Sequence, residues 1–286
     1  MTLFQLVKAT LDVLYGEAKR IYGNETDVRI SNAMAQLSAA YTNLLSRSRV
    51  PINYQDPVIR FAYVYKYVAA HGDYVYQSIE LLHERAGGPF LPNRLRLTCI
   101  GGGPGSDLIA MLKFLSDSSG MEVEKVTCYL IDGEQAWADT WTELDDAFEL
   151  PFRLSTNFQR IDVAQPGSWV DQRKFLDADI FTISYFVSEV MSLDQTGAVT
   201  DFWKTVFANA KSGALFCYID NGADVFNDYF DNIWKASGLQ PVITHDNVRM
   251  LPRYDEEKGH LGEFLGKFGQ QPKLQSIVSI RILHKP

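Results

Sequence analysis

The stretch that decides the fold is Leu95–Ser106, which reads LRLTCIGGGPGS. Leu95 to Ile100 is a short, mostly apolar run that predicts a buried strand, and Ser106 to Leu115 has the apolar spacing of a helix. The glycines between them let the backbone turn tightly and let a ligand approach, and the helix start offers unpaired N–H groups. We therefore predict a cofactor loop, although glycines at such a junction can also simply make a turn.

Downstream of this loop, short apolar runs alternate with helical segments. The predicted strands are Val126–Ile131, Phe158–Val163, Ile180–Ser184 and Ala214–Ile219, and the predicted helices are Glu134–Phe148 and Val199–Ala210. Such alternation predicts parallel strands joined by right-handed helical crossovers. Gln240–Thr244 and Gln275–Leu283 also have strand patterns but no comparable helix between them, so we expect an antiparallel pair at the edge of the sheet.

Upstream of the loop the pattern is helical up to about residue 86. Apolar residues recur at three- and four-residue steps, Pro51 and Pro57 interrupt the pattern, and Gly72 with Asp73 as N-cap is expected to open a further helix. We therefore predict two parts: a helical N-terminal cap over residues 1–88 and a cofactor-binding α/β domain over residues 89–286.

Composition indicates an ordinary globular protein. Of the 286 residues 46% are hydrophobic and 22% charged. No apolar run approaches the roughly 20 residues that cross a bilayer, and the N-terminus does not resemble a signal peptide, so we expect no membrane partner and a cytoplasmic location. Cys99, Cys128 and Cys217 lie in predicted strands without metal-ligand spacing, which favours core residues over disulfides or a metal site.

Charge is unevenly distributed along the chain. Residues 1–93 carry 9 Lys and Arg against 8 Asp and Glu, whereas residues 94–286 carry 18 against 27. An acidic surface repels phosphate backbones, so a nucleic-acid substrate is disfavoured, although Arg47 and Arg49 could form a local basic patch.

Two aspartates lie at the ends of the next two predicted strands. Asp132, with Gly133 after it, comes 27 residues after Gly105. In nucleotide-binding α/β sheets an acid at this point accepts hydrogen bonds from ribose hydroxyls. Asp162, with Val163 after it, could meet an adenine by its carboxylate or adjacent backbone. A turn-forming role for Asp162 before Pro166 is nearly as well supported.

The chain resembles the class I S-adenosylmethionine-dependent methyltransferase superfamily over about residues 90–286. The resemblance is carried by the order of three features: the glycine loop, Asp132 and Asp162. Gly101, Gly103 and Gly105 match its G-x-G-x-G motif, whereas the dinucleotide motif G-x-G-x-x-G needs Gly or Ala where Ser106 stands. The resemblance implies a Rossmann-like, mostly parallel seven-stranded sheet with an antiparallel C-terminal edge strand. It also implies S-adenosylmethionine as cofactor and S-adenosylhomocysteine as product. One departure is Cys99, where the family often has an acid, which implies a different network around the methionine amino group.

The same resemblance places the reacting groups after the fourth strand of the domain. Ser184 is expected at the cofactor, and Tyr185 and Glu189 could orient or deprotonate the acceptor. The alternative is that they are a packed aromatic ring and a helix-start carboxylate. Methyl transfer from a sulfonium depends mainly on alignment and water exclusion, so the lack of a catalytic triad is no objection.

The cap is rich in aromatic side chains. Seven lie between positions 54 and 76, enough to wall a pocket or face a cation, although such a stripe is more often a packing face: Tyr54, Phe61, Tyr63, Tyr65, Tyr67, Tyr74 and Tyr76. Five histidines are too scattered to predict a metal site.

The sequence therefore favours methyl transfer to an N or O acceptor on a small molecule or a protein side chain. The alternatives are transfer of the aminocarboxypropyl arm, an RNA methyltransferase, a nicotinamide oxidoreductase, and a degenerate binding module without activity. The acceptor and the oligomeric state do not follow from the sequence.

Overall fold

The computed structural model describes residues 2–42, 44, 52–86, 91–118, 122–145 and 150–286. Its centre is a seven-stranded sheet in the order β3-β2-β1-β4-β5-β7-β6. The strands are β1 (Arg94–Ile100), β2 (Lys125–Asp132), β3 (Arg153–Arg160), β4 (Ile180–Ser184), β5 (Leu215–Asn221), β6 (Gln240–Met250) and β7 (Ser276–His284).

Strands β3, β2, β1, β4 and β5 are parallel, and β7 runs antiparallel between β5 and β6. This is the Rossmann-like fold expected from the sequence, with its antiparallel pair closing one side of the sheet. The chain leaves β1 in one direction, through β2 to β3, and resumes at β4 on the other side of β1. Ligands of open α/β sheets bind at such a switch point, beside the carboxyl ends of the two central strands.

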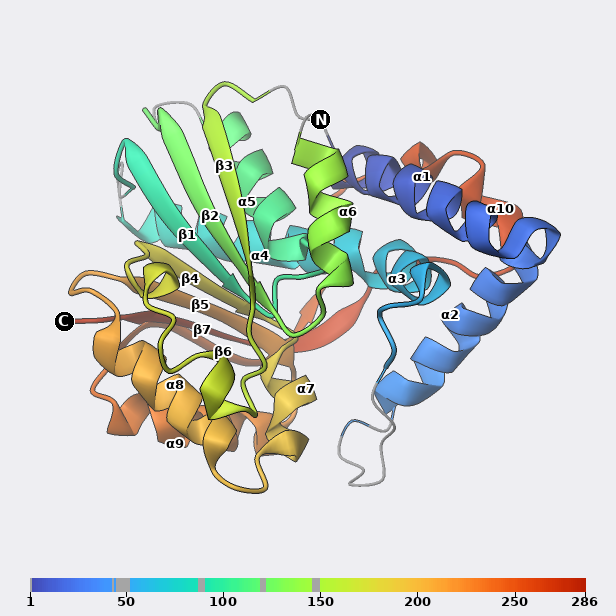
Figure 1. Cartoon of the computed structure of the whole chain (residues 1–286). Helices are drawn as coiled ribbons and strands as arrows, with labels where there is room; N and C mark the ends of the chain where they lie inside the picture. The colour runs from blue at the N-terminus through green and yellow to red at the C-terminus, as the bar shows by residue number, and fades with distance from the viewer. Residues whose placement is uncertain (1, 43, 45–51, 87–90, 119–121, 146–149) are drawn as a thin grey trace.

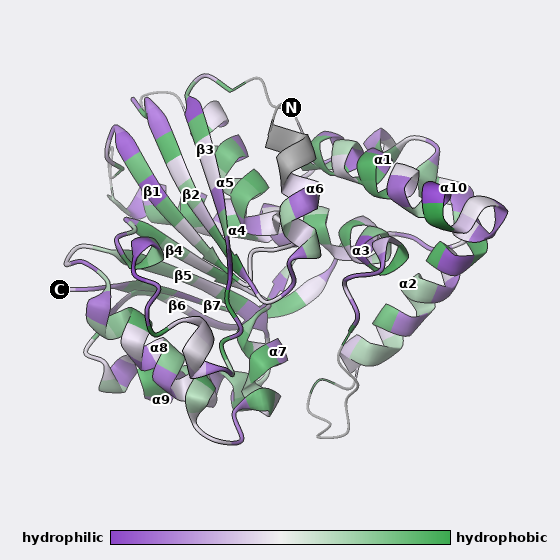
Figure 2. Ribbon diagram, in the orientation of Figure 1, coloured by the Kyte–Doolittle hydropathy of each residue, from purple (hydrophilic) through white to green (hydrophobic). Residues whose placement is uncertain are grey.

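Helices cover both faces of the sheet (Figure 1). One layer holds α4 (Ala69–Ala86), α5 (Ser106–Asp117) and α6 (Ala136–Asp145), and the other holds α8 (Ala198–Asn209) and α9 (Asp224–Ala236). In Figure 2 these last two helices carry alternating hydrophobic and hydrophilic bands, the pattern of a helix with one buried face. The sequence interpretation did not anticipate α9.

The N-terminal helices extend to one side of the sheet (Figure 1). They are α1 (Leu3–Tyr22), α2 (Thr26–Thr42) and α3 (Pro57–Tyr63), which continues through a π-helical turn (Val64–Val68) into α4. Short 3₁₀ turns span Gly23–Glu25, Pro166–Ser168, Lys174–Leu176, Met191–Leu193 and Lys258–Leu261, and the short helices α7 and α10 span Val187–Val190 and Phe264–Lys267.

The expected helix start at Gly72 and Asp73 is wrong, because both residues lie inside α4. A Cβ at Gly72 would lie 3.1 Å from the carbonyl oxygen of Ser106, so glycine here lets α4 approach the start of α5 closely. Asp73 is fully buried and forms an ion pair with Arg253, with 2.7 Å between Oδ1 and Nε. It is therefore a buried anchor rather than a cap.

The strand expected at Phe158–Val163 is displaced, because β3 spans Arg153–Arg160. β3 is an edge strand whose residues are half-buried or exposed, so it lacks the apolar run that marks β1 and β4.

The three cysteines are buried and free, as expected for core residues. Among the described residues no helix has the length and apolar character needed to span a bilayer.

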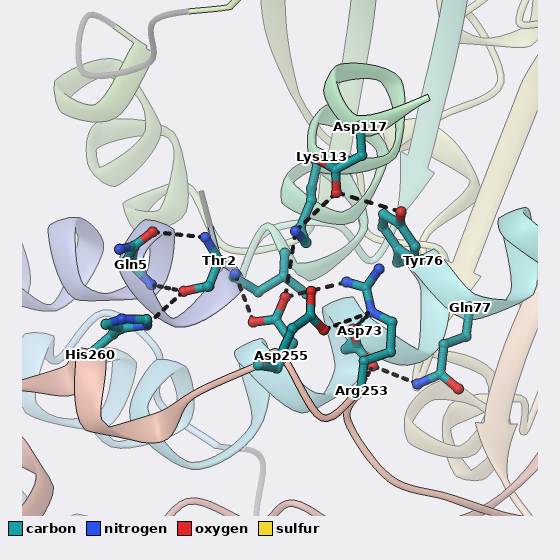
Figure 3. Close-up of polar contacts among 12 residues, drawn as sticks. Thr2, Gln5, Asp73, Tyr76, Gln77, Lys113, Asp117, Arg253, Asp255 and His260 are labelled. Atoms are coloured by element: carbon teal, nitrogen blue, oxygen red, sulfur yellow. Dashed lines mark hydrogen bonds and ion pairs between the residues drawn. The ribbon is translucent and has the colours of Figure 1, made fainter. Parts of the chain in front are cut away.

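The segment between β6 and β7, residues 251–275, folds back over the N-terminal helices and contacts α1. Figure 3 shows the polar cluster that anchors it. Arg253 pairs with Asp73 of α4 and with Glu256, whose Oε2 accepts the N–H of Leu3 at 2.9 Å. The guanidinium also lies 3.5 Å from the ring centroid of Tyr76. This cluster joins the start of α1 and the segment between β6 and β7 to α4. The domain boundary at residue 88 remains a prediction.

Candidate active site

A pocket lies at the switch point of the sheet. The glycine loop, the end of β2, the segment after β4, helix α6 and the N-terminal helical region all contribute to its walls. The lining residues are Tyr54, Tyr63, Gly101, Pro104, Asp132, Trp137, Ser184, Tyr185, Phe186 and Glu189. Residues far apart in the sequence, five of them predicted as site residues, therefore share one pocket.

The glycine loop is shaped by positive backbone angles and by hydrogen bonds to the neighbouring strand. Gly101 has φ +72° and Gly105 has φ +83°, a region that favours glycine. The N–H groups of Gly101 and Gly102 both donate to the carbonyl oxygen of Ile131, at 2.8 and 3.1 Å. The loop is thus fixed against the end of β2, with its backbone next to the pocket.

Two tryptophans of α6 pack directly on this loop. The indole N–H of Trp141 donates to the carbonyl oxygen of Gly103 at 2.7 Å, and a Cβ at Gly105 would lie 1.4 Å from the Trp141 ring. A Cβ at Gly103 would lie 2.4 Å from the Trp137 ring. These glycines therefore admit aromatic rings as well as any ligand. The sequence interpretation missed both tryptophans, although their four-residue spacing places them on one helix face.

Asp132 holds the loop from the end of β2. Its Oδ2 accepts the N–H of Gly103 at 3.0 Å, and its Oδ1 accepts the N–H of Glu134 at 2.9 Å. Burial raises the pKa of Asp132 to about 6, and these backbone hydrogen bonds limit the rise. A carboxylate accepts about four hydrogen bonds, so Asp132 retains acceptor capacity toward the pocket.

The segment after β4 holds Tyr185 in a strained conformation. Tyr185 has φ 53°, uncommon for a residue with a side chain. Its ring stacks on His71 of α4, with 3.6 Å between centroids and 11° between planes. Burial lowers the pKa of His71 well below its usual value, so this imidazole is neutral at pH 7. His71, missed in the sequence interpretation, links α4 to the pocket wall.

Glu189 lies one turn further on, in α7. Its Oε1 accepts a hydrogen bond from the hydroxyl of Tyr41 at 2.6 Å, and the hydroxyls of Tyr41 and Tyr54 are 2.8 Å apart. Helix α7 is held by the buried Asp220, whose Oδ2 accepts the N–H of Ser188 at 2.9 Å. The carboxylate of Glu189 in α7 is thus positioned in the pocket by three other parts of the chain: α2, the segment before α3, and β5.

A second buried carboxylate, missed in the sequence interpretation, lies beside the pocket. Asp107, in the first turn of α5, is 1% exposed, and its Oδ1 accepts a short hydrogen bond from the hydroxyl of Ser184. Its Oδ2 is buried without a hydrogen-bond partner among the described residues. Ser184 itself lines the pocket, so its hydroxyl connects the pocket to this carboxylate.

The remaining predicted site residues lie outside the pocket lining. The carboxylate of Asp162 accepts the N–H of Ala164 at 3.0 Å and the amide of Gln165 at 2.8 Å, which is the turn-forming role. Val163 is buried in the core, whereas Gly133 is exposed beside Asp132. Gly103 and Gly105 belong to the loop without lining the pocket. Within the described ranges no cluster of three metal-ligating side chains occurs.

Comparison with known proteins finds similar structures but no related sequence. No protein-family model matches the chain. No curated protein matches it either.

Several solved structures are similar to the chain. An O-methyltransferase family protein from Burkholderia thailandensis has 12% identity and a TM-score of 0.48, with 92% of this chain and 73% of that one covered. A putative methyltransferase from Bacillus halodurans C-125 has 11% identity and a TM-score of 0.44, covering 74% and 98%. The N-methyltransferase NodS from Bradyrhizobium japonicum WM9, in complex with S-adenosyl-L-homocysteine, has 9% identity and a TM-score of 0.39, covering 73% and 86%. Sequence identities this low show a similar fold and do not identify the reaction or its acceptor.

Proposed function

We propose that this protein is an S-adenosylmethionine-dependent methyltransferase that acts on an N or O acceptor. The observation that carries the proposal is that Asp132, the glycine loop and Glu189 meet in one pocket at the switch point of the sheet. The acidic charge of residues 94–286 favours a small molecule or a protein side chain over a nucleic acid as acceptor. With no membrane-spanning helix among the described residues, we extend the proposal to a cytoplasmic enzyme.

The residues present fit an adenosyl cofactor. Each oxygen of Asp132 accepts one backbone N–H and has room for a further donor, as two adjacent ribose hydroxyls require. Gly101 lines the pocket together with Asp132. Because glycine has no side chain, the backbone of the loop is open to a ligand beside that carboxylate. Asp162 uses its carboxylate in its own turn, so any contact with the adenine would come from the backbone near Val163.

Bound S-adenosylmethionine supplies an activated methyl group on a sulfonium, so the protein's task is alignment and exclusion of water. Tyr54, Tyr63 and Trp137 wall the pocket and limit access of water. Glu189, oriented by Tyr41, is placed to hold the acceptor or to take a proton from it. The strained backbone of Tyr185 fixes the turn that leads into α7.

The test is a binding measurement on the purified protein. We expect S-adenosylmethionine and S-adenosylhomocysteine to raise the melting temperature by several degrees, since a ligand at about 100 times its dissociation constant stabilises by about 2.7 kcal/mol. Stabilisation by NAD or NADP instead, or by none of these compounds, would reject the proposal in favour of an oxidoreductase or a binding module.

The matched variant is Asp132→Ala. It removes charge-assisted contacts to the ribose that are worth roughly 1.5–3 kcal/mol, so we expect affinity for S-adenosylhomocysteine to fall about 10- to 100-fold by calorimetry. Lys204→Ala, on the exposed surface of α8, is the control and should bind as the parent does. Parent-like binding by Asp132→Ala would show that the cofactor lies elsewhere.

Methyl transfer is distinguished from its nearest alternative by product analysis. With cofactor labelled in the methyl group, label appears in the acceptor after methyl transfer and remains in methylthioadenosine after transfer of the aminocarboxypropyl arm.

A further inference from the structure

Asp107 is a buried carboxylate that the proposed chemistry does not yet use. It is 1% exposed, at the start of α5, directly after the glycine loop. Its Oδ1 accepts hydrogen bonds from the hydroxyls of Ser184 and Ser106, the latter at 3.2 Å, while its Oδ2 has no hydrogen-bond partner in the described part of the chain. A buried carboxylate left in this way is costly unless a cation or further donors compensate it.

No cation of the protein is paired with Asp107 among the described residues. Its acidic neighbours include the thiols of Cys99 and Cys217, whose pKa values are raised by burial and further by the charge of Asp107, so both are neutral at pH 7. The hydroxyl of Thr182, on the same face of β4 as Ser184, is buried beside Asp107 and lowers the pKa of its carboxyl group. The negative charge therefore faces polar but uncharged groups on the protein side.

The hydroxyl of Ser184 lies between the carboxylate of Asp107 and the pocket. Because its hydrogen is donated to Asp107, Ser184 offers only oxygen lone pairs on its pocket side. A group in the pocket can therefore hydrogen-bond to Ser184 only as a donor. A positively charged donor gains in addition from the carboxylate behind the hydroxyl, since the interaction is little screened where both groups are buried.

We propose that Asp107 is a positioning residue that acts through Ser184 to hold the α-ammonium group of the cofactor's amino acid arm. The inference rests on the proposed function, because an adenosyl cofactor supplies the ammonium. It also explains how the site operates with a cysteine, Cys99, at the end of β1: the acid is contributed by the helix after the loop instead of by the strand before it.

The experiment compares two ligands that differ only in this ammonium. S-adenosylhomocysteine carries it, and its deaminated analogue keeps the adenosine, the sulfur and the carboxylate of the arm. For Asp107→Asn we expect affinity for S-adenosylhomocysteine to fall about tenfold or more by calorimetry, and affinity for the analogue to stay within about twofold of the parent. Ser184→Ala should give the same pattern. A purely structural role would weaken both ligands equally, and that result would overturn the inference.

Two further arms keep the outcomes distinct. Asp132→Ala should weaken both ligands alike, because both contain the ribose. If the parent binds neither ligand, the proposed function fails; if the parent binds both and Asp107→Asn does not distinguish them, only the role of Asp107 fails. Ser184→Thr, which keeps the hydroxyl, should restore the preference for the ammonium and separates loss of the hydroxyl from loss of folding.

Discussion

The carboxyl group of Asp107 couples stability to pH as well as to ligand binding. Burial raises its pKa to about 6, and the surrounding hydroxyls limit the rise. In an unfolded chain the pKa is about 3.9. The folded state therefore holds this proton more tightly, so the stability it contributes is fully present below about pH 4 and is lost as the pH rises through about 6. Asp132 and Asp220, with pKa values also raised to about 6, act with the same sign.

Asp107→Asn should consequently stabilise the ligand-free protein at neutral pH. Each pKa unit corresponds to about 1.4 kcal/mol, so we expect the free energy of unfolding at about pH 7 to rise by on the order of 2 kcal/mol relative to the parent. The gain should shrink toward zero near pH 4, where the parent's carboxyl is protonated. Urea unfolding at both pH values checks this. A variant less stable than the parent at both would show that the charge is compensated within the protein.

Among the secondary-structure elements, those with a clear hydrophobic period could be predicted and those shaped by tertiary contacts could not. β4 matches its expected bounds because every residue before Ser184 is buried and apolar or β-branched. β3 was displaced because an edge strand needs no such run. The helix break expected at Gly72 is absent because that glycine serves the packing of α4 on α5.

The candidate site follows the same division. Gly101, Asp132 and Glu189 could be placed from motif and order, because each lies at the end of a predicted strand or within five residues of it. Asp107, His71 and Trp141 could not, because their roles depend on which helix packs against the loop, and no short-range pattern in the sequence carries that information.

The short helix α7 depends on one side chain of β5. Asp220 is fully buried and accepts the N–H groups of Ser188 and Asn221, at 2.9 and 2.7 Å. The amide of Asn221 in turn donates to the hydroxyl of Ser188 at 3.0 Å. These bonds fix the start of the helix that carries Glu189.

Asp220→Ala should therefore loosen α7 rather than the cofactor site. It leaves backbone N–H groups unsatisfied, which costs about 1–3 kcal/mol for each buried group, so we expect a melting temperature several degrees lower. Affinity for S-adenosylhomocysteine should remain within a few fold, because Asp132 and the glycine loop are untouched. Asp220→Asn keeps an acceptor oxygen and should lose less stability. If the alanine variant melts with the parent, α7 is held by its packing instead.

Across the whole molecule, the N-terminal helices and the sheet share one core. The same hydrophobic cluster contains Leu11 of α1, Tyr74 of α4 and Leu97 of β1. Helix α4, which the predicted boundary assigns to the cap, contacts α5 and β5 as part of the layer that covers the sheet. A substitution that shifts the N-terminal helices is thus expected to shift the glycine loop as well, because α4 packs on α5 and α5 begins directly after the loop.

The cluster around Arg253 is the polar counterpart of this shared core (Figure 3). Asp73 and the side chain of Glu256 are completely buried, and the Arg253 side chain is 18% exposed. Lys113 of α5 lies 3.7 Å from Glu256 and so extends the cluster to the helix after the glycine loop. Removing the arginine leaves the buried Asp73 without its cation and leaves Glu256 with Lys113 alone, and breaking a buried pair in this way typically costs about 3–5 kcal/mol.

We therefore expect Arg253→Ala to lower the free energy of unfolding by about 3 kcal/mol or more, measured by urea denaturation. Lys204→Ala breaks an exposed pair with Asp201 and should cost less than about 0.5 kcal/mol. Asp73→Asn combined with Arg253→Ala should cost less than the two single changes added together, because each single change already removes the ion pair between these two residues. Hydrogen exchange should accelerate in α1, α4 and residues 251–275 at once, since the cluster joins all three. Faster exchange confined to residues 251–275 would mean that the arginine only anchors its own loop and that the cap is held by apolar packing alone.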